Sequence, residues 1–467
     1  MGRLVVIGGG AAGMSAASAA RRVAPDLEVV VCEAGGFAAY GMCGIPYFLG
    51  GVVPRAESLL AYSPGEFRGQ RGIDLRLNTR VDAIDARARR VHLSGEGGTG
   101  PLGYDLLVVA SGADPVRPPV PGLDQPRVFT IRSLDEAIKL RRLLDSGVVR
   151  RAIVVGAGYI GLETAEALVC AGIEVQVIEA LPRVLGTVDE PIAELARDEL
   201  ERHARLRLGA RLNAVREDAG LAGGGLIAVV DGDEVGTDLV VIATGVRPAT
   251  DLLIRAGARH LADRSVVVDA SMRTSLPDVF AAGDCVALPH LVLGGSAWVP
   301  LGPAANKTGR VAGTVAAGGT ASFAGVVGTA VVKVFDLEVA RTGLGLGEAR
   351  AAGLAAVATD VVSRSRAKYY PGSSPLHVRL VYTPDGRLLG GQLAGREGAA
   401  KRIDVLATAL YARLTVADLA ALDLSYAPPF APVYDPVLAV AAKAARSAAS
   451  TAEPASRPAA STIGGSS

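Results

Sequence analysis

The chain has 467 residues and a formal net charge of +1; half of its residues are hydrophobic and 20% are charged. This length predicts two to four domains, and the composition argues against a largely disordered chain. The near-neutral charge and an aromatic content of only 4% give no support to a nucleic-acid or anionic-membrane partner.

The first residues, MGRLVVIGGG, enter a predicted strand without the basic region, apolar run and small-residue cleavage site of a secretory signal. No segment approaches the roughly 18 unbroken apolar residues of a membrane span. We therefore expect a cytoplasmic protein without membrane contact. The four cysteines lie far apart and form no Cys-x-x-Cys pair, which argues against a disulfide framework and a metal site; they are Cys32, Cys43, Cys170 and Cys285.

Residues 3–33 read RLVVIGGGAAGMSAASAARRVAPDLEVVVCE. This pattern predicts a strand, a glycine turn, an Ala-rich helix and a second strand that ends at an acid. Gly8 permits a tight turn, Gly10 lets a pyrophosphate approach the backbone, and Gly13 lets the helix pack on the strand. Glu33, 25 residues after Gly8, is placed to accept hydrogen bonds from a ribose 2′-hydroxyl.

Residues 152–179 repeat the scheme as AIVVGAGYIGLETAEALVCAGIEVQVIE, with Gly156, Gly158 and Gly161 in the turn and Glu179 as the terminal acid. One such motif in a glycine-rich chain is a weak signal, but two copies in full strand-turn-helix-strand context are a strong one. Two dinucleotide sites imply two cofactors that exchange electrons, and the expected pair is a flavin dinucleotide and a nicotinamide dinucleotide.

Three later apolar runs end in small residues. Residues 104–122 and 238–250 each combine a strand with a Gly-x-x-Pro turn, and we expect them to be crossovers between domains. Residues 278–285 (DVFAAGDC) predict a strand that ends in Gly283 and Asp284. A carboxylate there is placed to hold the ribityl hydroxyls of a flavin, although a turn or capping role also explains an Asp at such a site.

The order of these motifs resembles that of the pyridine nucleotide-disulfide oxidoreductases over residues 1 to about 440. The single cysteine in CGIPYFLGG, in place of a Cys-x4-Cys pair, is similar to the branch that holds coenzyme A disulfide reductase, NADH oxidase and NADH peroxidase. Three later segments resemble the C-terminal dimerisation domain of coenzyme A disulfide reductases; they are 367–380, 395–410 and 423–436.

The resemblance implies an α/β fold with two doubly wound Rossmann-like nucleotide-binding domains plus an α+β C-terminal dimerisation domain. We expect the nicotinamide domain to be inserted in the flavin domain, and a tail of Ala, Ser, Pro and Gly to be disordered. The predicted boundaries are 1–115 with 250–322 for FAD, 116–249 for NAD(P)H, 323–445 for dimerisation, and 446–467 for the tail.

The resemblance also implies an NAD(P)H-dependent, FAD-containing disulfide reductase. Electrons would pass through the flavin and Cys43 to a low-molecular-weight disulfide such as coenzyme A disulfide, or to polysulfide. Cys43 would lie against the flavin, with Gly41 and Gly44 allowing close backbone approach, and a helix N-terminus or positive dipoles would lower its pKa. Because no second cysteine is near, the oxidised form would be a mixed disulfide or a sulfenic acid.

Two alternatives remain open at this point. One is an NADH oxidase that uses O2, and the other is a flavin electron-transfer protein in which Cys43 is incidental. The commonest fate of a free cysteine is to be buried and inert. We expect that fate for the other three cysteines, which are Cys32, Cys170 and Cys285.

In the coenzyme A branch, two tyrosines from the partner subunit act near the departing thiolate, and Tyr369 and Tyr426 match them. A core aromatic role is the alternative for each. NADH oxidases and peroxidases carry a His just after the first glycines, where this chain has Ala11 and Ala12. The resemblance therefore favours thiol–disulfide chemistry in a homodimer with shared active sites.

The resemblance assigns further contacts residue by residue. For FAD they are Gly8, Gly10, Ala12, Gly13, Glu33, Val81, Gly112, Gly283, Asp284, Pro300 and Leu301. For the nicotinamide cofactor they are Gly156, Gly158, Tyr159, Ile160, Gly161, Glu163, Glu179 and Gly245. For the substrate they are Ser15, Arg22, Arg71 and Asn306.

The sequence predicts the identity of the substrate and of the nicotinamide cofactor less clearly. Ala19, Ala39 and Met42 replace three polar coenzyme contacts of the family, so coenzyme A and polysulfide both stay open as substrates. Glu179 is followed by Ala and Leu with no adjacent Arg, which predicts NADH and leaves NADPH as the second choice.

Overall fold

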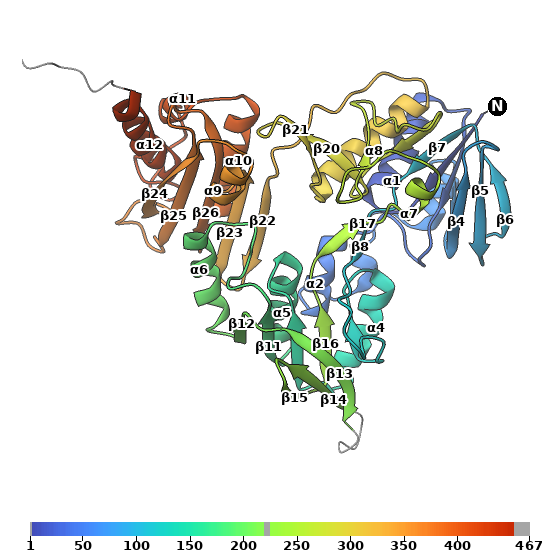
Figure 1. Ribbon diagram of the computed structural model, residues 1–467, viewed down its shortest axis with the longest axis horizontal. Helices are drawn as coiled ribbons and strands as arrows, with labels where there is room; N and C mark the ends of the chain where they lie inside the picture. Colours follow the sequence, from blue (N-terminus) through green and yellow to red (C-terminus); the bar gives the residue numbers. More distant parts are fainter. Residues whose placement is uncertain (1, 219–224, 453–467) are drawn as a thin grey trace, which may run out of the picture. The chain divides into compact units, whose positions relative to one another are not determined.

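The computed structural model describes residues 2–218 and 225–452, and it divides into two compact units between Leu337 and Glu338. Figure 1 shows the elements in chain order. The first unit is built around two parallel five-stranded sheets, and the second around an antiparallel sheet. The predicted fold class is therefore what the structure has.

The first parallel sheet has the strand order β19-β7-β1-β2-β3. Its inner strands are buried along nearly their whole length, which explains why their sequences read as unbroken apolar runs. Its members come from two distant stretches of the chain; they are β1 (Arg3–Ile7), β2 (Glu28–Cys32), β3 (Ile73–Arg76), β7 (Leu106–Val109) and β19 (Val279–Ala281).

Helices α1 (Ala11–Val23) and α8 (Gly302–Ala316) pack together in this first region, although some 290 residues separate them in sequence. They touch through backbone. A Cβ added at Gly309 would lie 2.1 Å from the carbonyl oxygen of Ala12, and one at Gly313 would lie 2.0 Å from that of Ala16. Only glycine permits this approach.

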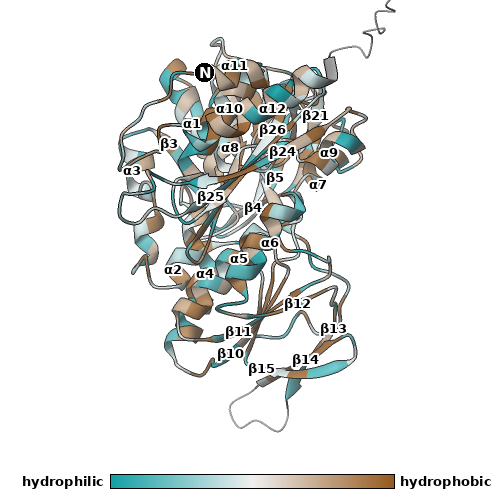
Figure 2. Cartoon of the chain, turned by 90° about the vertical axis from the view of Figure 1, so that its left-hand side faces the viewer, coloured by the Kyte–Doolittle hydropathy of each residue, from teal (hydrophilic) through white to brown (hydrophobic). Residues whose placement is uncertain are grey.

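The second parallel sheet has the order β12-β11-β10-β16-β9, and its strands labelled β10 and β11 in Figure 2 are drawn mostly in hydrophobic colours. Its strands are β9 (Val128–Phe129), β10 (Arg151–Val155), β11 (Glu174–Glu179), β12 (Arg205–Leu208) and β16 (Leu239–Ile242). Its helices are α4 (Leu134–Asp145), α5 (Tyr159–Cys170) and α6 (Glu190–Leu200).

The two segments predicted as crossovers pair with each other. Strand β8 (Ala113–Pro115) is antiparallel to β17 (Val246–Pro248), with Asp114 opposite Arg247. The chain thus leaves for the second sheet and returns from it through neighbouring strands. This is the geometry that an inserted nucleotide domain needs, and the boundaries 115/116 and 249/250 stay a prediction.

Smaller elements complete the first unit. The small sheets are β4 (Thr79–Asp85), β5 (Arg90–Gly95) and β6 (Gly100–Gly103); β13 (Leu212–Asp218), β14 (Gly225–Val230) and β15 (Asp233–Thr237); and β18 (Val266–Val267), β20 (Val286–His290) and β21 (Gly295–Ala297). The short helices are η1 (Met42–Gly44), α2 (Ile45–Leu49), η2 (Ala56–Leu59), α3 (Pro64–Gly69) and α7 (Asp251–Arg255), and β22 (Ala330–Val334) precedes the division.

In the second unit the strands β23-β26-β25-β24 form an antiparallel array. They are β23 (Leu337–Gly343), β24 (Val357–Arg364), β25 (Pro375–Tyr382) and β26 (Leu388–Gly395), with helices α9 (Leu346–Ala351), α10 (Ala399–Tyr411), α11 (Val416–Ala420) and α12 (Pro436–Ala452).

The predicted disordered tail is partly wrong. Helix α12 continues through Ala452 and leaves Ala448 only 9% exposed, whereas the sequence placed the start of the tail at 446. The reason is that alanine is the best helix former and needs little apolar surface to pack. The remainder of the predicted tail, 453–467, lies outside the described residues.

Candidate active site

The two predicted glycine turns have the same geometry. A Cβ added at Gly8 or Gly156 would lie 2.3 Å from the carbonyl oxygen of Ala110 or Ala243, and both glycines have positive φ. A Cβ at Gly13 would lie 1.8 Å from the carbonyl oxygen of Gly8. The first and third glycines of a motif are therefore required by close packing of strand, turn and helix.

The middle glycines are different. A Cβ on Gly10 or Gly158 would meet nothing within 4 Å, and these residues precede the first turns of α1 and α5. Open space beside an exposed helix N-terminus fits a pyrophosphate, which backbone N–H groups and the helix dipole stabilise. The two turns thus fit the two dinucleotides that the sequence predicts.

Each terminal acid is held by backbone amides of its own turn. The Glu33 carboxylate accepts hydrogen bonds from the N–H groups of Gly9 (2.6 Å) and Gly35 (2.7 Å). The Glu179 carboxylate accepts them from Ala157 (2.7 Å) and Leu181 (2.8 Å). A carboxylate has about four lone-pair sites, so each acid keeps acceptor capacity for ribose hydroxyls.

The end of β19 meets the first glycine turn. Gly283 donates its N–H to the Thr308 hydroxyl (3.1 Å), and a Cβ added to Gly283 would lie 2.8 Å from the Cβ of Ala12. Asp284 follows directly, and burial raises the pKa of its carboxyl while Arg132 opposes the rise. The structure therefore brings the predicted flavin residues Ala12, Gly283 and Asp284 together.

The other assigned contacts are spread over the unit. Val81 is buried in β4, Pro300 and Leu301 lie just before α8, and Ile160 is exposed in the first turn of α5. Gly112 and Gly245 have positive φ and flank the β8–β17 pair. Their contacts with cofactors stay predictions.

Arg132 is a residue that the sequence analysis missed. Its Nε donates to the carbonyl oxygen of Ala113 (2.7 Å), its Nη1 lies 3.8 Å from the Met42 sulfur, and it acts electrostatically on Asp284. The preceding Ile131 has φ of +55°, which is a strained conformation for a β-branched residue. The Glu136 carboxylate stabilises this backbone conformation, because it accepts a hydrogen bond from the Arg132 N–H at 3.0 Å.

The only sequence signal for this region was Ser133 followed by Glu136, which marks the start of a helix and does not single out an arginine. Arg132 is linked to three other segments, by a hydrogen bond to Ala113, by a contact with Met42 and by the effect of its charge on Asp284. We propose it as an additional flavin-side residue.

Cys43 is exposed in the one-turn helix η1, which runs directly into α2. A Cβ at Gly44 would lie 2.4 Å from Leu59 Cδ2, so the Leu59 side chain would have to shift, whereas a Cβ at Gly41 would only reach the Leu59 carbonyl oxygen at 3.8 Å. The expected lowering of the thiol pKa is wrong for the protein alone. Desolvation raises the pKa of Cys43, and the carboxylates of Glu163 and Asp284 raise it further.

The remaining cysteines behave differently from one another. Cys32 and Cys285 are buried, and burial raises the pKa of each thiol to about 11, as expected for inert residues. Cys170 is exposed at the end of α5, so its expected burial is wrong. The apolar neighbours Leu168 and Val169 point elsewhere on the helix, because residues adjacent in sequence face different directions.

Helix α5 carries the predicted nicotinamide-side residues Tyr159 and Glu163. The Thr187 hydroxyl donates to the Tyr159 hydroxyl at 3.1 Å. Burial, together with the charge of Glu166, raises the pKa of Glu163 to about 7. Glu163 therefore carries a carboxyl that titrates near neutral pH.

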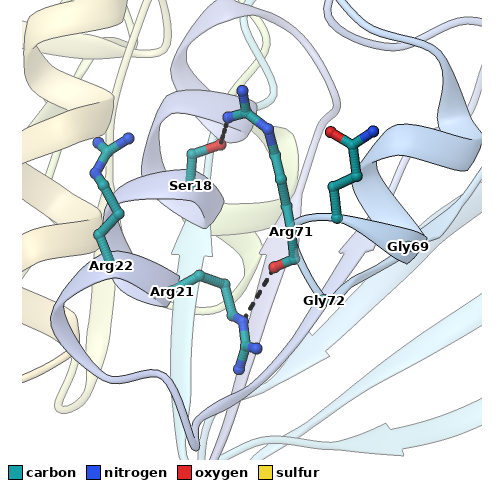
Figure 3. Close-up of a pocket in the computed structure, with 7 residues that line it drawn as sticks. Ser18, Arg21, Arg22, Gly69, Arg71 and Gly72 are labelled. Atoms are coloured by element: carbon teal, nitrogen blue, oxygen red, sulfur yellow. Dashed lines mark hydrogen bonds between the residues drawn. The ribbon is translucent and has the colours of Figure 1, made fainter.

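The predicted substrate residues form two groups. The Ser15 hydroxyl donates to the side-chain oxygen of Asn306 (2.9 Å), which joins α1 to α8. Arg22 and Arg71 line a cavity of about 580 Å³, shown in Figure 3. Ser18, Arg21, Gly69, Gln70 and Gly72 complete its lining.

The arginines of this cavity are not equivalent. The Arg21 guanidinium donates hydrogen bonds to the carbonyl oxygens of Arg71 (3.2 Å) and Leu27 (2.9 Å). These backbone contacts leave it fewer donors for a ligand. The Arg71 guanidinium stacks 4.0 Å from the ring centre of Tyr62 and lies 3.4 Å from the Ser18 hydroxyl. Arg22 has no polar partner among the described residues, and Figure 3 shows its head group on the same side as that of Arg71.

In the second unit, Tyr369 and Tyr426 lie together. Their side chains are 76% and 47% exposed, and a hydrogen bond to Tyr369 raises the pKa of the Tyr426 hydroxyl. The alternative of a core aromatic is therefore wrong for both. Further exposed apolar side chains of the second unit are Phe430, Val433 and Tyr434.

The fold and the two glycine turns define an oxidoreductase with two dinucleotide sites. The chain belongs to the pyridine nucleotide-disulphide oxidoreductase family, whose model matches residues 2–309, and the dimerisation domain of that family matches residues 329–436. This confirms the predicted class of enzyme, one that uses FAD and a nicotinamide dinucleotide.

Individual relatives cover most of the chain. The NAD(P)H sulfur oxidoreductase (CoA-dependent) of Pyrococcus furiosus is 37% identical over 433 residues, which is 92% of this chain and 96% of the relative. The coenzyme A disulfide reductase of Staphylococcus haemolyticus is 29% identical, over 92% of this chain and 96% of the relative.

A solved structure of an NAD-dependent persulfide reductase from A. fulgidus is 38% identical, with a TM-score of 0.91 over 95% of this chain and 83% of that one. The described residues include no helix that is long and apolar enough to cross a bilayer.

Proposed function

We propose that this chain reduces a low-molecular-weight disulfide or polysulfide with electrons from NAD(P)H, and that Cys43 is the thiol that carries them. The observation behind the proposal is the position of Cys43. It is exposed. The negative charges of Glu163, on the nicotinamide-side helix, and of Asp284, on the flavin side, both act on its thiol and raise the pKa. An exposed cysteine beside the flavin site is suited to take electrons from the flavin and pass them to the sulfur of a substrate.

When bound, FAD would take a hydride from the nicotinamide and supply an electron pair. The residues of the chain itself would bind and orient the two cofactors and the substrate. The two glycine turns would hold the pyrophosphates, Glu33 and Glu179 the riboses, and Asp284 the ribityl chain. Cys43 as a thiolate would attack one sulfur of the substrate, which forms a mixed disulfide and releases the other sulfur.

We infer that the preferred substrate carries phosphate groups, as coenzyme A does. Arg22 and Arg71 present guanidinium groups into one cavity, and Arg71 is pre-oriented by stacking on Tyr62. Arginine pairs well with phosphate because its fork of donors matches two phosphate oxygens. The names of three similar proteins mention coenzyme A, which supports the same substrate class despite Ala39 and Met42.

An NADH-consumption assay with coenzyme A disulfide, polysulfide, peroxide and O2 side by side tests this function. We expect the highest kcat/KM with coenzyme A disulfide or polysulfide. Double replacement of Arg22 and Arg71 by Ala should lower kcat/KM for coenzyme A disulfide about tenfold to a hundredfold, since two phosphate contacts are lost. Activity with polysulfide alone should change little; an equal loss with both substrates would contradict the phosphate role.

An NADH oxidase is the second candidate, because a protein of that name from Methanocaldococcus jannaschii is 33% identical over 92% of this chain. The absence of a His at Ala11 and Ala12 speaks against peroxide chemistry at Cys43. O2 consumption that exceeds disulfide reduction in the same assay would favour this candidate.

We also propose a cytoplasmic homodimer in which Tyr369 and Tyr426 serve the partner's Cys43 site. The family's dimerisation domain and the exposed apolar side chains of the second unit support it. An exposed surface with Phe430 and Tyr434 more than 70% accessible is costly to leave in water. Light scattering of the purified protein should give twice the chain mass of 47.6 kDa.

A further inference from the structure

The turn that carries Asp284 is restrained through its backbone. Gly283, with φ of +81°, turns the chain after β19, and its carbonyl oxygen accepts a hydrogen bond from the Val286 N–H (3.2 Å). The Ala282 N–H donates to the carbonyl oxygen of Val109 at the end of β7 (3.0 Å). These bonds limit the positions from which the Asp284 side chain can start.

Two side chains from a later segment also bind this turn. The Thr308 hydroxyl in α8 accepts a hydrogen bond from the Gly283 N–H (3.1 Å), and it donates to the Ala304 carbonyl oxygen of its own helix (2.8 Å). The Trp298 indole donates its N–H to the Asp284 carbonyl oxygen at 2.6 Å. The segment that leads into α8 and the helix itself therefore hold the backbone of Gly283 and of Asp284.

Trp298 reaches Asp284 because the antiparallel hairpin of β20 and β21 (Figure 1) turns the chain back after the flavin-side turn. The indole is half-buried, and its single polar group is a donor that needs an acceptor when it leaves water. Trp298 also stands just before Pro300 and Leu301, to which we assign flavin contacts. It thus connects two segments that are predicted to contact FAD.

The Asp284 carboxyl itself is left without a protein partner. Within residues 2–218 and 225–452 it makes no hydrogen bond and no ion pair, although it is half-buried. A carboxylate that is partly removed from water needs hydrogen-bond donors. The hydroxyls of a ribityl chain are such donors, and a carboxylate on a restrained backbone binds them at a lower entropic cost.

We propose that Trp298, together with Thr308, is a positioning residue for FAD, because it holds the backbone of Asp284 so that the free carboxyl meets the ribityl chain. The inference deepens the proposed function and rests on its assignment of Asp284 to FAD. Trp298 acts through Asp284, so its contribution to FAD binding should disappear when the carboxyl is removed. A residue that only stabilised the fold would contribute equally with and without that carboxyl.

A double-mutant cycle on the FAD-loaded full-length protein tests this, with flavin release after dilution followed by fluorescence. Asp284→Ala should release FAD about tenfold to a hundredfold faster, and Trp298→Phe, which keeps an aromatic ring and loses the N–H, about threefold to tenfold faster. In the Asp284→Ala background, Trp298→Phe should change the rate by less than about twofold. Thr308→Val should behave in the same way, and it supplies a second cycle if Trp298→Phe does not fold.

Thr237→Val is the matched control. The buried Thr237 hydroxyl at the end of β15 also donates to a backbone carbonyl, that of Leu239 (3.0 Å), so this variant should lower the melting temperature without changing flavin release. Equal effects of Trp298→Phe in the two backgrounds, or no effect in either, would overturn the inference and leave the proposed function intact. Release from Asp284→Ala at the wild-type rate would remove Asp284 from the flavin site, and the inference would then fail together with that part of the proposed function.

Discussion

At the scale of single residues, the sequence predicted the groups whose place depends on local spacing. The glycines of the two turns and the acids Glu33 and Glu179 are such groups, because a strand-turn-helix-strand unit determines where each one lies. Arg132 could not be predicted in this way. Its guanidinium donates a hydrogen bond to Ala113, lies 3.8 Å from the Met42 sulfur and acts electrostatically on Asp284, and these residues belong to three other segments.

Cys43→Ser tests the thiol at the centre of the proposal. The expected variant folds and keeps FAD, because none of the predicted FAD contacts involves the Cys43 sulfur. It should lose disulfide reduction by orders of magnitude, since a serine hydroxyl is not ionised near neutral pH. Anaerobic titration should show uptake of one electron pair per flavin in place of two. A variant that reduces disulfides at the parent rate would place the chemistry elsewhere.

Glu179 and Leu181 test the choice between NADH and NADPH. The Glu179 carboxylate is suited to a 2′-hydroxyl and repels a 2′-phosphate, and Leu181 is 53% exposed beside it. The double variant Glu179→Ala with Leu181→Arg should shift the NADPH/NADH ratio of kcat/KM upward by at least about tenfold. Glu174→Ala, at the exposed start of the same strand, is the control and should leave the ratio unchanged. A wild-type preference for NADPH would contradict the prediction.

At the scale of elements, periodicity predicted α1, β1 and β2 closely, because their apolar pattern is local. The contact between α1 and α8 was not predictable, since it joins segments about 290 residues apart through backbone approach at Gly309 and Gly313. The sequence shows these glycines but not what they touch. In the same way, the Ala-rich end of α12 lacked the apolar pattern that marks a packed helix.

Gly309→Ala tests this helix contact. The added Cβ would lie 2.1 Å from the Ala12 carbonyl oxygen, so α1 and α8 must separate, at a cost of about 1–3 kcal/mol. The apparent melting temperature should fall by several degrees and FAD should dissociate more readily, because Ala12 also meets Gly283. Gly302→Ala in the first turn of the same helix has open space and should leave both measurements unchanged. Equal melting temperatures for the two variants would argue against close backbone contact.

At the scale of the whole molecule, the question is whether one active site needs two chains. Within the second unit, Tyr369 and Tyr426 form an exposed, hydrogen-bonded pair, and they are more than 300 residues from Cys43 in sequence. A pair of hydroxyls that exchange one hydrogen bond is suited to donate a proton to a departing thiolate. The sequence does not indicate whether this tyrosine pair acts on Cys43 of its own chain or of the partner subunit, because that depends on how two chains assemble.

Subunit exchange answers this question. A Cys43→Ser chain and a Tyr369→Phe, Tyr426→Phe chain should each be about a hundredfold less active with coenzyme A disulfide, since one lacks the nucleophile and the other the acid. In a mixed dimer with shared sites, one site regains both an intact Cys43 and an intact tyrosine pair. Mixing should therefore restore activity toward one quarter of the wild-type value, because about half of the dimers are mixed and each holds one complete site of two. Differently tagged chains would verify the exchange, and verified mixed dimers without activity would show that each site is built from a single chain.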